Sequence, residues 1–276
     1  MKKALIATAL GLTATFAMTA PAQAHFMMMY TPEIAMEKAE DLDMRIAFTH
    51  PAEAGHMMNM GGINEFYAMY QRGENEPQKI DFKPLLKEIT WTNPESSAPA
   101  FSAYIPRKEI RSMGDYVFVM VPGYYLEKEE DCYMQQITKL VTNVGGVPTI
   151  WNEPVGLPCE IVPSAKPYGL WAGNVFQGQV LSNGEPVPFA EIEVEYMSHM
   201  PNLESNSMPA ESSVDYPNGV LVTQAIFADA NGVFTYGIPK AGWWGFAALG
   251  VGPDTEHQGK ELSQDAVIWV KAEEMK

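Results

Sequence analysis

The fold is decided by residues 174–196, which read NVFQGQVLSNGEPVPFAEIEVEY. The first part is rich in strand-forming side chains, and the last part alternates glutamate with Ile192, Val194 and Tyr196. Between them stands Asn183-Gly184, a dipeptide typical of tight hairpin turns. Strict alternation of apolar and polar residues is the mark of a half-buried strand. The segment therefore predicts two strands joined by tight turns.

Further strands are predicted on the C-terminal side of this segment, over residues 220–228, 233–236, 243–249 and 266–270. The polar, proline-bearing stretch 197–218 is expected to be a long loop. Short strands at this spacing favour a small antiparallel β-sandwich. We expect its core to take Ile192, Val194, Phe234, Phe246 and one of Trp243 and Trp244.

The N-terminal side also consists mostly of predicted strands, over residues 44–50, 66–70, 89–91, 115–121 and 135–144. One short helix is predicted over 31–40, with Thr31 as N-cap and Pro32 at the first helical position. Prolines recur through residues 151–167, a pattern that favours an extended connector. The sequence therefore predicts an all-β protein with two β-sandwich-like domains, residues 25–166 and 167–276.

Composition narrows the function classes. The chain has 276 residues, and 46% of them are hydrophobic, which is a composition typical of globular proteins. Its formal net charge of -16 argues against binding to nucleic acid or to an anionic membrane surface. Two cysteines exclude a disulfide framework or a multi-cysteine metal site. Cys132 and Cys159 either pair or remain as two buried thiols. Hydrolase, phosphate-loop, H-E-x-x-H and dinucleotide motifs are absent, so the sequence does not indicate an enzyme.

Residues 1–24 have the pattern of an export signal. Lys2 and Lys3 precede an apolar stretch over residues 4–20, and Ala22-Gln23-Ala24 forms an A-x-A cleavage site. The apolar stretch is too short for a mature transmembrane helix, and no later stretch qualifies. We expect cleavage after Ala24 and a periplasmic protein that does not itself span the membrane.

Cleavage there makes His25 the first residue, so its amine and imidazole could bind one metal ion. The chain has only five histidines. Residues 50–57 hold His50, Glu53, His56 and Met57, which supply imidazole, carboxylate and thioether ligands. Methionines also fill cores, so the run Met27-Met28-Met29 is either packing or part of the site. His199 lies in the predicted loop 197–218 and is a weaker candidate, and His257 is expected to be a solvated surface residue.

Several runs resemble the periplasmic nickel/cobalt-uptake component family, an extracytoplasmic accessory of energy-coupling-factor type transporters. The likeness covers essentially the whole mature chain. The runs are His25-Phe26, Phe48-Thr49-His50-Pro51, Glu130-Asp131-Cys132, Thr138-Lys139, 155–163, 167–178, 228–234 and, as the most specific match, 239–249.

The resemblance implies two β-domains, the second like the transthyretin-type regulatory modules found beside carboxypeptidases. It also implies a site around His25 and His50, with Met57 as a weaker match, whereas His56 and Met58–Met60 are particular to this chain. The implied function is non-catalytic capture of Ni²⁺ or Co²⁺ and its delivery to the membrane component of a transporter.

Three alternatives remain open at this point. A periplasmic copper chaperone or resistance protein would use the same histidines together with methionine thioethers. An adhesin-like or structural β-module would bind no metal. An oxidative enzyme would place two histidines around a metal in an aromatic groove, but Trp243 and Trp244 are adjacent and would face opposite sides of a strand.

Overall fold

The computed structural model describes residues 25–276 and is built almost entirely of β-strands. The predicted export signal, residues 1–24, lies outside the described residues. Two short 3₁₀ helices, η1 (Lys83–Leu85) and η2 (Gly219–Leu221), accompany the strands. Within residues 25–276, no helix has the length and apolar character that crossing a membrane would require.

A 12-stranded sheet forms the centre of the molecule. Its main path runs through β16 (Thr223–Phe227), β15 (Glu191–Tyr196), β18 (Gly242–Ala248), β20 (Lys260–Glu273), β10 (Cys132–Val144), β8 (Gly114–Pro122), β4 (Ile63–Tyr70) and β5 (Gln78–Asp81). Four short strands attach to this path, β2 (Ala35–Met36), β9 (Tyr125–Glu127), β12 (Leu170–Trp171) and β19 (Glu256–His257).

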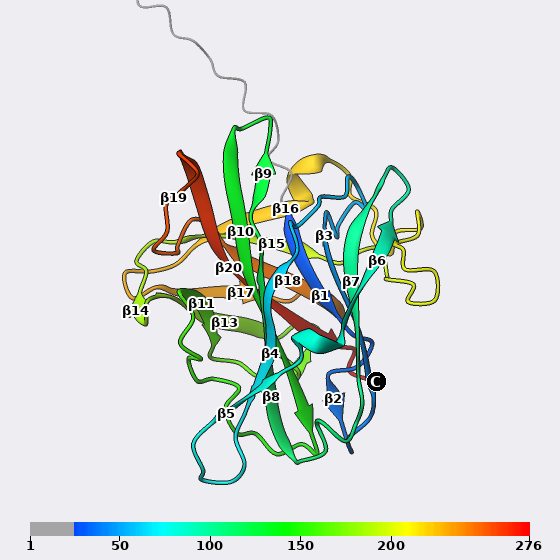
Figure 1. Ribbon diagram of the computed structural model, residues 1–276, viewed down its shortest axis with the longest axis vertical. Coiled ribbons are helices and arrows are strands. Elements are labelled where there is room, and N and C mark those ends of the chain that lie inside the picture. The colour runs from blue at the N-terminus through cyan, green and yellow to red at the C-terminus, as the bar shows by residue number, and fades with distance from the viewer. Residues whose placement is uncertain (1–24) are drawn as a thin grey trace, which may run out of the picture.

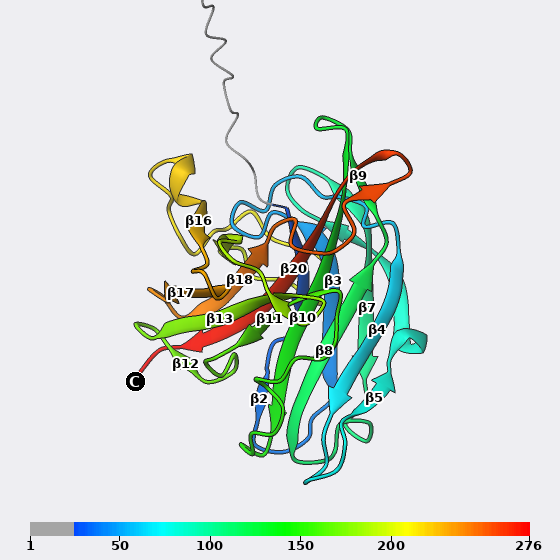
Figure 2. The ribbon, with the colours of Figure 1, turned by 90° about the vertical axis from the view of Figure 1, so that its left-hand side faces the viewer.

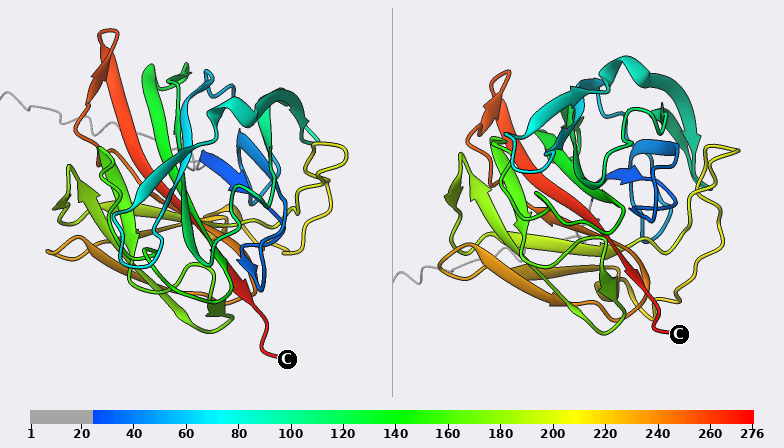
Figure 3. Two further views of the ribbon diagram at one scale, coloured as in Figure 1. Left: turned by 60° about the horizontal axis from the view of Figure 1, so that its bottom comes forward. Right: turned by 90° about the horizontal axis from the view of Figure 1, so that it is seen from below.

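Two four-stranded sheets cover parts of the central sheet, one on each side of it (Figure 3). The N-terminal sheet has the order β1 (Phe26–Tyr30), β3 (Leu42–Thr49), β7 (Ser97–Ile105) and β6 (Leu86–Thr92). The other sheet contains β11 (Cys159–Pro163), β13 (Val175–Ser182), β14 (Glu185–Pro186) and β17 (Val233–Gly237). The all-β, sandwich-like fold predicted from the sequence is therefore confirmed.

The alternation of side chains in β18 separates two hydrophobic cores. Trp243 and Ala247 belong to the core under the N-terminal sheet, whereas Trp244 and Phe246 belong to the core under β13 and β17. Successive residues of a strand point to opposite faces, so one strand supplies both cores. The predicted core residues Ile192, Val194, Phe234 and Phe246 are all buried. Of the two tryptophans, Trp244 belongs to this core, as predicted, and Trp243 is buried in the other core.

The central sheet contains strands from both sides of the predicted boundary between residues 166 and 167. Strands β10 and β20 pair in parallel, with Tyr133 opposite Leu262 and Leu140 opposite Trp269 (Figure 1). The proline-bearing stretch 151–167 includes β11, which pairs with β13. The two sandwich-like halves therefore share a layer.

The short helix predicted over residues 31–40 is wrong. Ile34 and Met36 are buried and Ala35 is exposed, which is a strand-like alternation, and β2 pairs with the end of β10. The Asn143 N–H donates to the Ile34 carbonyl at 2.7 Å, and the Gly145 N–H donates to the Met36 carbonyl at 2.8 Å. Pairing with a long buried strand outweighs the helix-start signal of Thr31 and Pro32.

Residues 197–218 form a long loop, as predicted, between β15 and η2. Strand β1, in contrast, was not predicted as a strand. Met27, Met28 and Met29 are fully buried in it and belong to the core under the N-terminal sheet. The methionine run is therefore packing.

Candidate metal-binding site

His25 and His50 lie side by side at one end of the N-terminal sheet. Strands β1 and β3 are antiparallel, with Phe26 opposite Thr49, so the residues immediately outside this pair meet across the ladder. The two imidazole rings have centroids 4.8 Å apart and an interplanar angle of 52°. His50 is buried, and the His25 side chain keeps 20% of its surface exposed. The site therefore lies near the surface, at the upper end of β1 in Figure 1.

The backbone of His25 is held by Gln136 of β10. The Gln136 Nε2 group donates to the His25 carbonyl at 2.7 Å, and its Oε1 accepts from the Met27 N–H at 2.7 Å. The Trp269 indole N–H also donates to the Met27 carbonyl at 2.9 Å. These contacts anchor the His25 carbonyl and the start of β1 to the central sheet.

His50 is held by the turn that follows it. The Ala54 N–H donates to the His50 carbonyl at 2.9 Å, and the Met58 N–H returns to the Phe48 carbonyl at 3.0 Å. Ala54 adopts a positive φ of 49°, which a single turn residue can take at some cost. The turn is compact enough that a Cβ added at Gly55 would lie 3.7 Å from the His50 ring.

Aromatic and acidic side chains from β9 close the other side of the site. Tyr125 packs near His25 at 6.2 Å between centroids and edge-on to Phe48 at 5.3 Å. The Glu127 Oε2 atom lies 3.4 Å from His25 Nε2. Burial, reinforced by Glu127, raises the pKa of Tyr125 to about 12, so its hydroxyl stays protonated at neutral pH. It donates to Glu127 Oε2 at 3.2 Å.

The other predicted ligands differ in how the structure places them. His56 and Glu53 are exposed, whereas Met57 is buried and its N–H donates to Ser96 Oγ at 2.8 Å. Among residues 25–276, no three His, Cys, Asp or Glu side chains gather in a group that could hold a metal ion. The structure therefore brings together two of the predicted residues, His25 and His50.

The remaining histidines and the two cysteines have other environments. His199 is buried, and its Nδ1 lies 2.9 Å from the Pro209 carbonyl. His257 was expected to be solvated, but it stacks on Tyr124 at 3.8 Å between centroids and meets Tyr133 edge-on at 4.7 Å. Cys132 and Cys159 are both free thiols, and only Cys159 is buried. A disulfide between them is therefore not present.

Glu127 and Tyr125 were missed by sequence reasoning. Glu127 stands in an acidic stretch with Glu129 and Glu130, and nothing in that pattern distinguishes it from a solvated charge run. Its position depends on β9 pairing with the start of β10, where Cys132 lies opposite Glu127. Glu127 becomes informative only because this hairpin contacts His25, which is far from it in the sequence.

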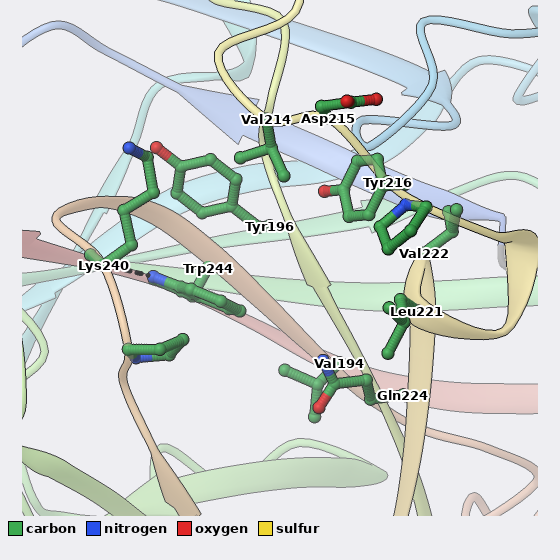
Figure 4. Close-up of a pocket in the computed structure, with 12 residues that line it drawn as sticks. Val194, Tyr196, Val214, Asp215, Tyr216, Leu221, Val222, Gln224, Lys240 and Trp244 are labelled. Carbon is green, nitrogen blue, oxygen red and sulfur yellow. Dashed lines mark hydrogen bonds between the residues drawn. The ribbon is translucent and has the colours of Figure 1, made fainter.

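A separate pocket of about 340 Å³ lies in the other half of the molecule, against β15, β18 and the loop 197–218. Figure 4 shows Tyr196, Tyr216 and Trp244 around it, with Lys240 at one end and Leu221 and Val222 on the far wall. Its lining contains no histidine, cysteine or methionine, so it does not compete with the His25–His50 pair as a metal site.

The chain belongs to a family described only as a domain of unknown function, DUF4198, whose model matches residues 22–252. A comparison with curated proteins gives no match.

Solved structures give only distant likenesses. The D0-D1 domain of intimin is 10% identical with a TM-score of 0.21, over 89% of this chain and 98% of that one. Trypsin-activated alpha-2-macroglobulin from Escherichia coli is 10% identical with a TM-score of 0.22, over 92% of this chain. Salmonella alpha-2-macroglobulin reacted with methylamine is 9% identical with a TM-score of 0.26, over 90% of this chain. The chain spans 16% and 17% of these two macroglobulins. No functional property is carried over from any of them.

Proposed function

We propose that this member of the DUF4198 family is exported, is cleaved after Ala24, and captures Ni²⁺ or Co²⁺ in the periplasm for delivery to the membrane component of a nickel/cobalt transporter. The observation that carries the proposal is the pairing of the His25 and His50 imidazoles, whose ring centroids lie 4.8 Å apart. The proposed cleavage makes His25 the first residue of the mature chain. The metal is the cargo of the protein, and no catalysis is involved.

Cleavage supplies the donor that the two side chains lack. The His25 nitrogen is an amide in the precursor and becomes an amine in the mature chain, and the low pKa of a terminal amine, about 7.7–8.0, lets a metal displace its proton easily. Amine, His25 imidazole and His50 imidazole together form a nitrogen set that suits divalent nickel, cobalt and copper. The hydrogen bond from Gln136 to the His25 carbonyl supports the proposal, because it anchors this end of the chain beside His50.

Delivery to a transporter requires reversible binding. The His25 side chain is 20% exposed, so the metal can enter and leave without opening the core. Remaining coordination positions can be taken by water. Glu53 and His56 are exposed on the turn after His50, and within residues 25–276 neither forms a group of three with the two imidazoles.

Copper remains the second candidate cargo because nitrogen ligands bind it more tightly than nickel. The positions of the methionine thioethers help to decide between copper and nickel. Met57, Met58 and Met60 are buried in the core under the N-terminal sheet, together with Met27–Met29. A site built on nitrogen donors favours divalent ions over copper(I), which prefers thioether ligands.

The test compares the chain beginning at His25 with the same chain preceded by Gly-Ser, and with the variant His50→Ala, by calorimetric titration with Ni²⁺. Loss of an outer-shell partner already costs about 10–100-fold in metal affinity, so loss of a donor should cost at least about 100-fold. We expect both changed proteins to lose that much. His56→Ala should have a smaller effect.

His257→Ala is the matched control, because it removes an imidazole that packs between Tyr124 and Tyr133. Its affinity for Ni²⁺ should equal that of the parent. Equal affinity of the native and Gly-Ser-extended chains would exclude the terminal amine as a donor. Retained affinity in His50→Ala would place the site elsewhere.

A further inference from the structure

The carboxylate of Glu127 is held against the Nε2 edge of the His25 ring. Its Oε2 atom lies 3.4 Å from Nε2 and also accepts from the Tyr125 hydroxyl at 3.2 Å. Its Oε1 atom accepts from the Glu129 N–H at 3.0 Å. The Glu127 side chain is only 13% exposed. Both oxygens are therefore positioned by β9 and its turn, without any contribution from a metal ion.

The two nitrogens of His25 are not equivalent for a terminal chelate. Nδ1 is attached to the ring carbon that carries Cβ, so Nδ1 and the terminal amine can bind one metal ion in a compact ring. Nε2 lies on the far edge of the imidazole and cannot close that ring. A neutral imidazole carries one proton, and only the other nitrogen can bind a metal.

We propose that Glu127 is a positioning residue for the metal site: it accepts the Nε2–H of His25, which fixes the tautomer in which the deprotonated Nδ1 stands beside the terminal amine. This inference rests on the proposed function. A metal-binding histidine generally donates its other ring N–H to a carboxylate or carbonyl, which orients the ring and increases the basicity of the binding nitrogen. Glu127 occupies that place here.

The arrangement favours this role over direct coordination by Glu127. The carboxylate faces Nε2, on the opposite side of the imidazole from the chelate, and its oxygens already accept from Tyr125 and Glu129. The ring of Tyr125 packs near that of His25, so the tyrosine ring and the Glu127 carboxylate both restrict the orientation of the imidazole.

The direct test reads the tautomer without any metal. The chain beginning at His25, labelled with ¹⁵N-histidine, is examined by long-range ¹H–¹⁵N correlation at about pH 8, above the usual imidazole pKa of about 6.5. We expect His25 to carry its proton on Nε2. Glu127→Gln should keep that tautomer, because the amide oxygen still accepts, and Glu127→Ala should give a mixture. A proton on Nδ1 in the native chain, or an unchanged tautomer in Glu127→Ala, would overturn the inference.

Ni²⁺ titration separates positioning from coordination. Glu127→Ala should lose about 10–100-fold in affinity, the usual cost of removing an outer-shell partner, and Glu127→Gln should stay within about threefold of the parent. Equal large losses in both variants would instead make Glu127 a metal ligand and overturn the positioning role. Glu129→Ala, an exposed glutamate in the same hairpin, is the matched control and should behave as the parent.

The tautomer measurement and the Ni²⁺ titration also distinguish failure of this inference from failure of the proposed function. If the native chain binds no Ni²⁺, the proposed function fails, and the tautomer of His25 still decides the role of Glu127. If Ni²⁺ binds through the amine and His50 but the Nε2 proton is absent, the proposed function stands and the inference fails.

Discussion

Replacing Glu160 with alanine is expected to lower the free energy of unfolding by about 3–5 kcal/mol, the usual cost of leaving one partner of a buried ion pair alone. Glu160 Oε2 lies 2.7 Å from Lys139 Nζ, and the two side chains are only 1% and 2% exposed. Burial lowers the pKa of Lys139, and the Glu160 carboxylate opposes that effect. Without the carboxylate, the ammonium group would have to lose its proton or draw in water.

The same carboxylate also holds the chain between the two halves. It accepts the N–H groups of Val155, Gly156 and Leu157 at 3.0–3.4 Å. Lys139 belongs to β10 of the central sheet, and Glu160 belongs to β11 of the sheet that packs on it. The pair therefore fixes the proline-bearing connector to the strand that both halves share.

Urea denaturation of Glu160→Ala, Lys139→Met and the double variant Lys139→Met/Glu160→Gln measures this effect. The double variant should recover most of the lost stability, since it buries no charge and its glutamine oxygen can still accept the loop N–H groups. If the double variant is as unstable as Glu160→Ala, the isolated ammonium is not the cause of the loss.

Most of the strands could be predicted from the sequence because their signals are local. The alternation of Ile192, Val194 and Tyr196 and the Asn183-Gly184 turn depend only on neighbouring residues, and the structure places a strand on each side of that turn. The parallel pairing of β10 with β20 could not be predicted, since it joins residues more than a hundred positions apart. For the same reason the shared central sheet was not foreseen.

Parts of the candidate site could likewise be predicted from the sequence, and other parts could not. The family resemblance implied a site around His25 and His50, and the pairing of β1 with β3 places His25 beside His50. The methionine run was ambiguous because a buried strand and a soft-metal motif both place consecutive methionines together. Gln136 and Glu127 reach the site from β10 and β9, and no local pattern marks either residue.

Glu195 lies beneath the turn that holds His50, and its environment predicts an unusual dependence of stability on pH. It is 1% exposed, and its Oε1 accepts from the Thr223 hydroxyl on β16. The Ser198 N–H, three residues further on, donates to the Pro51 carbonyl at 3.2 Å. Burial raises the pKa of Glu195 from 4.5 to about 8, although hydrogen bonds from Thr223 and the Ala52 backbone oppose the shift.

The direction of the pH effect follows from where the proton is held. Below the unfolded pKa of 4.5 the carboxyl is protonated in both states, and its contribution to stability is fully present. As the pH rises towards about 8, the unfolded chain ionises while the folded chain retains its proton, so stability falls. The loss between pH 4.5 and 8 should be roughly 4 kcal/mol. Glu193, whose pKa burial raises to about 7, adds to the fall.

Glu195→Gln should therefore flatten this dependence. Glutamine carries no titrating proton and keeps the Thr223 hydroxyl as a donor, so the variant should resemble the parent at about pH 5 and exceed it by roughly 3–4 kcal/mol at about pH 8.5. Urea midpoints at the two pH values measure the difference. Glu191→Gln, an exposed change on the same strand, should leave the parent's pH dependence unchanged. An equally steep fall in Glu195→Gln would mean that Glu195 does not retain its proton in the folded protein at neutral pH and that other groups cause the fall.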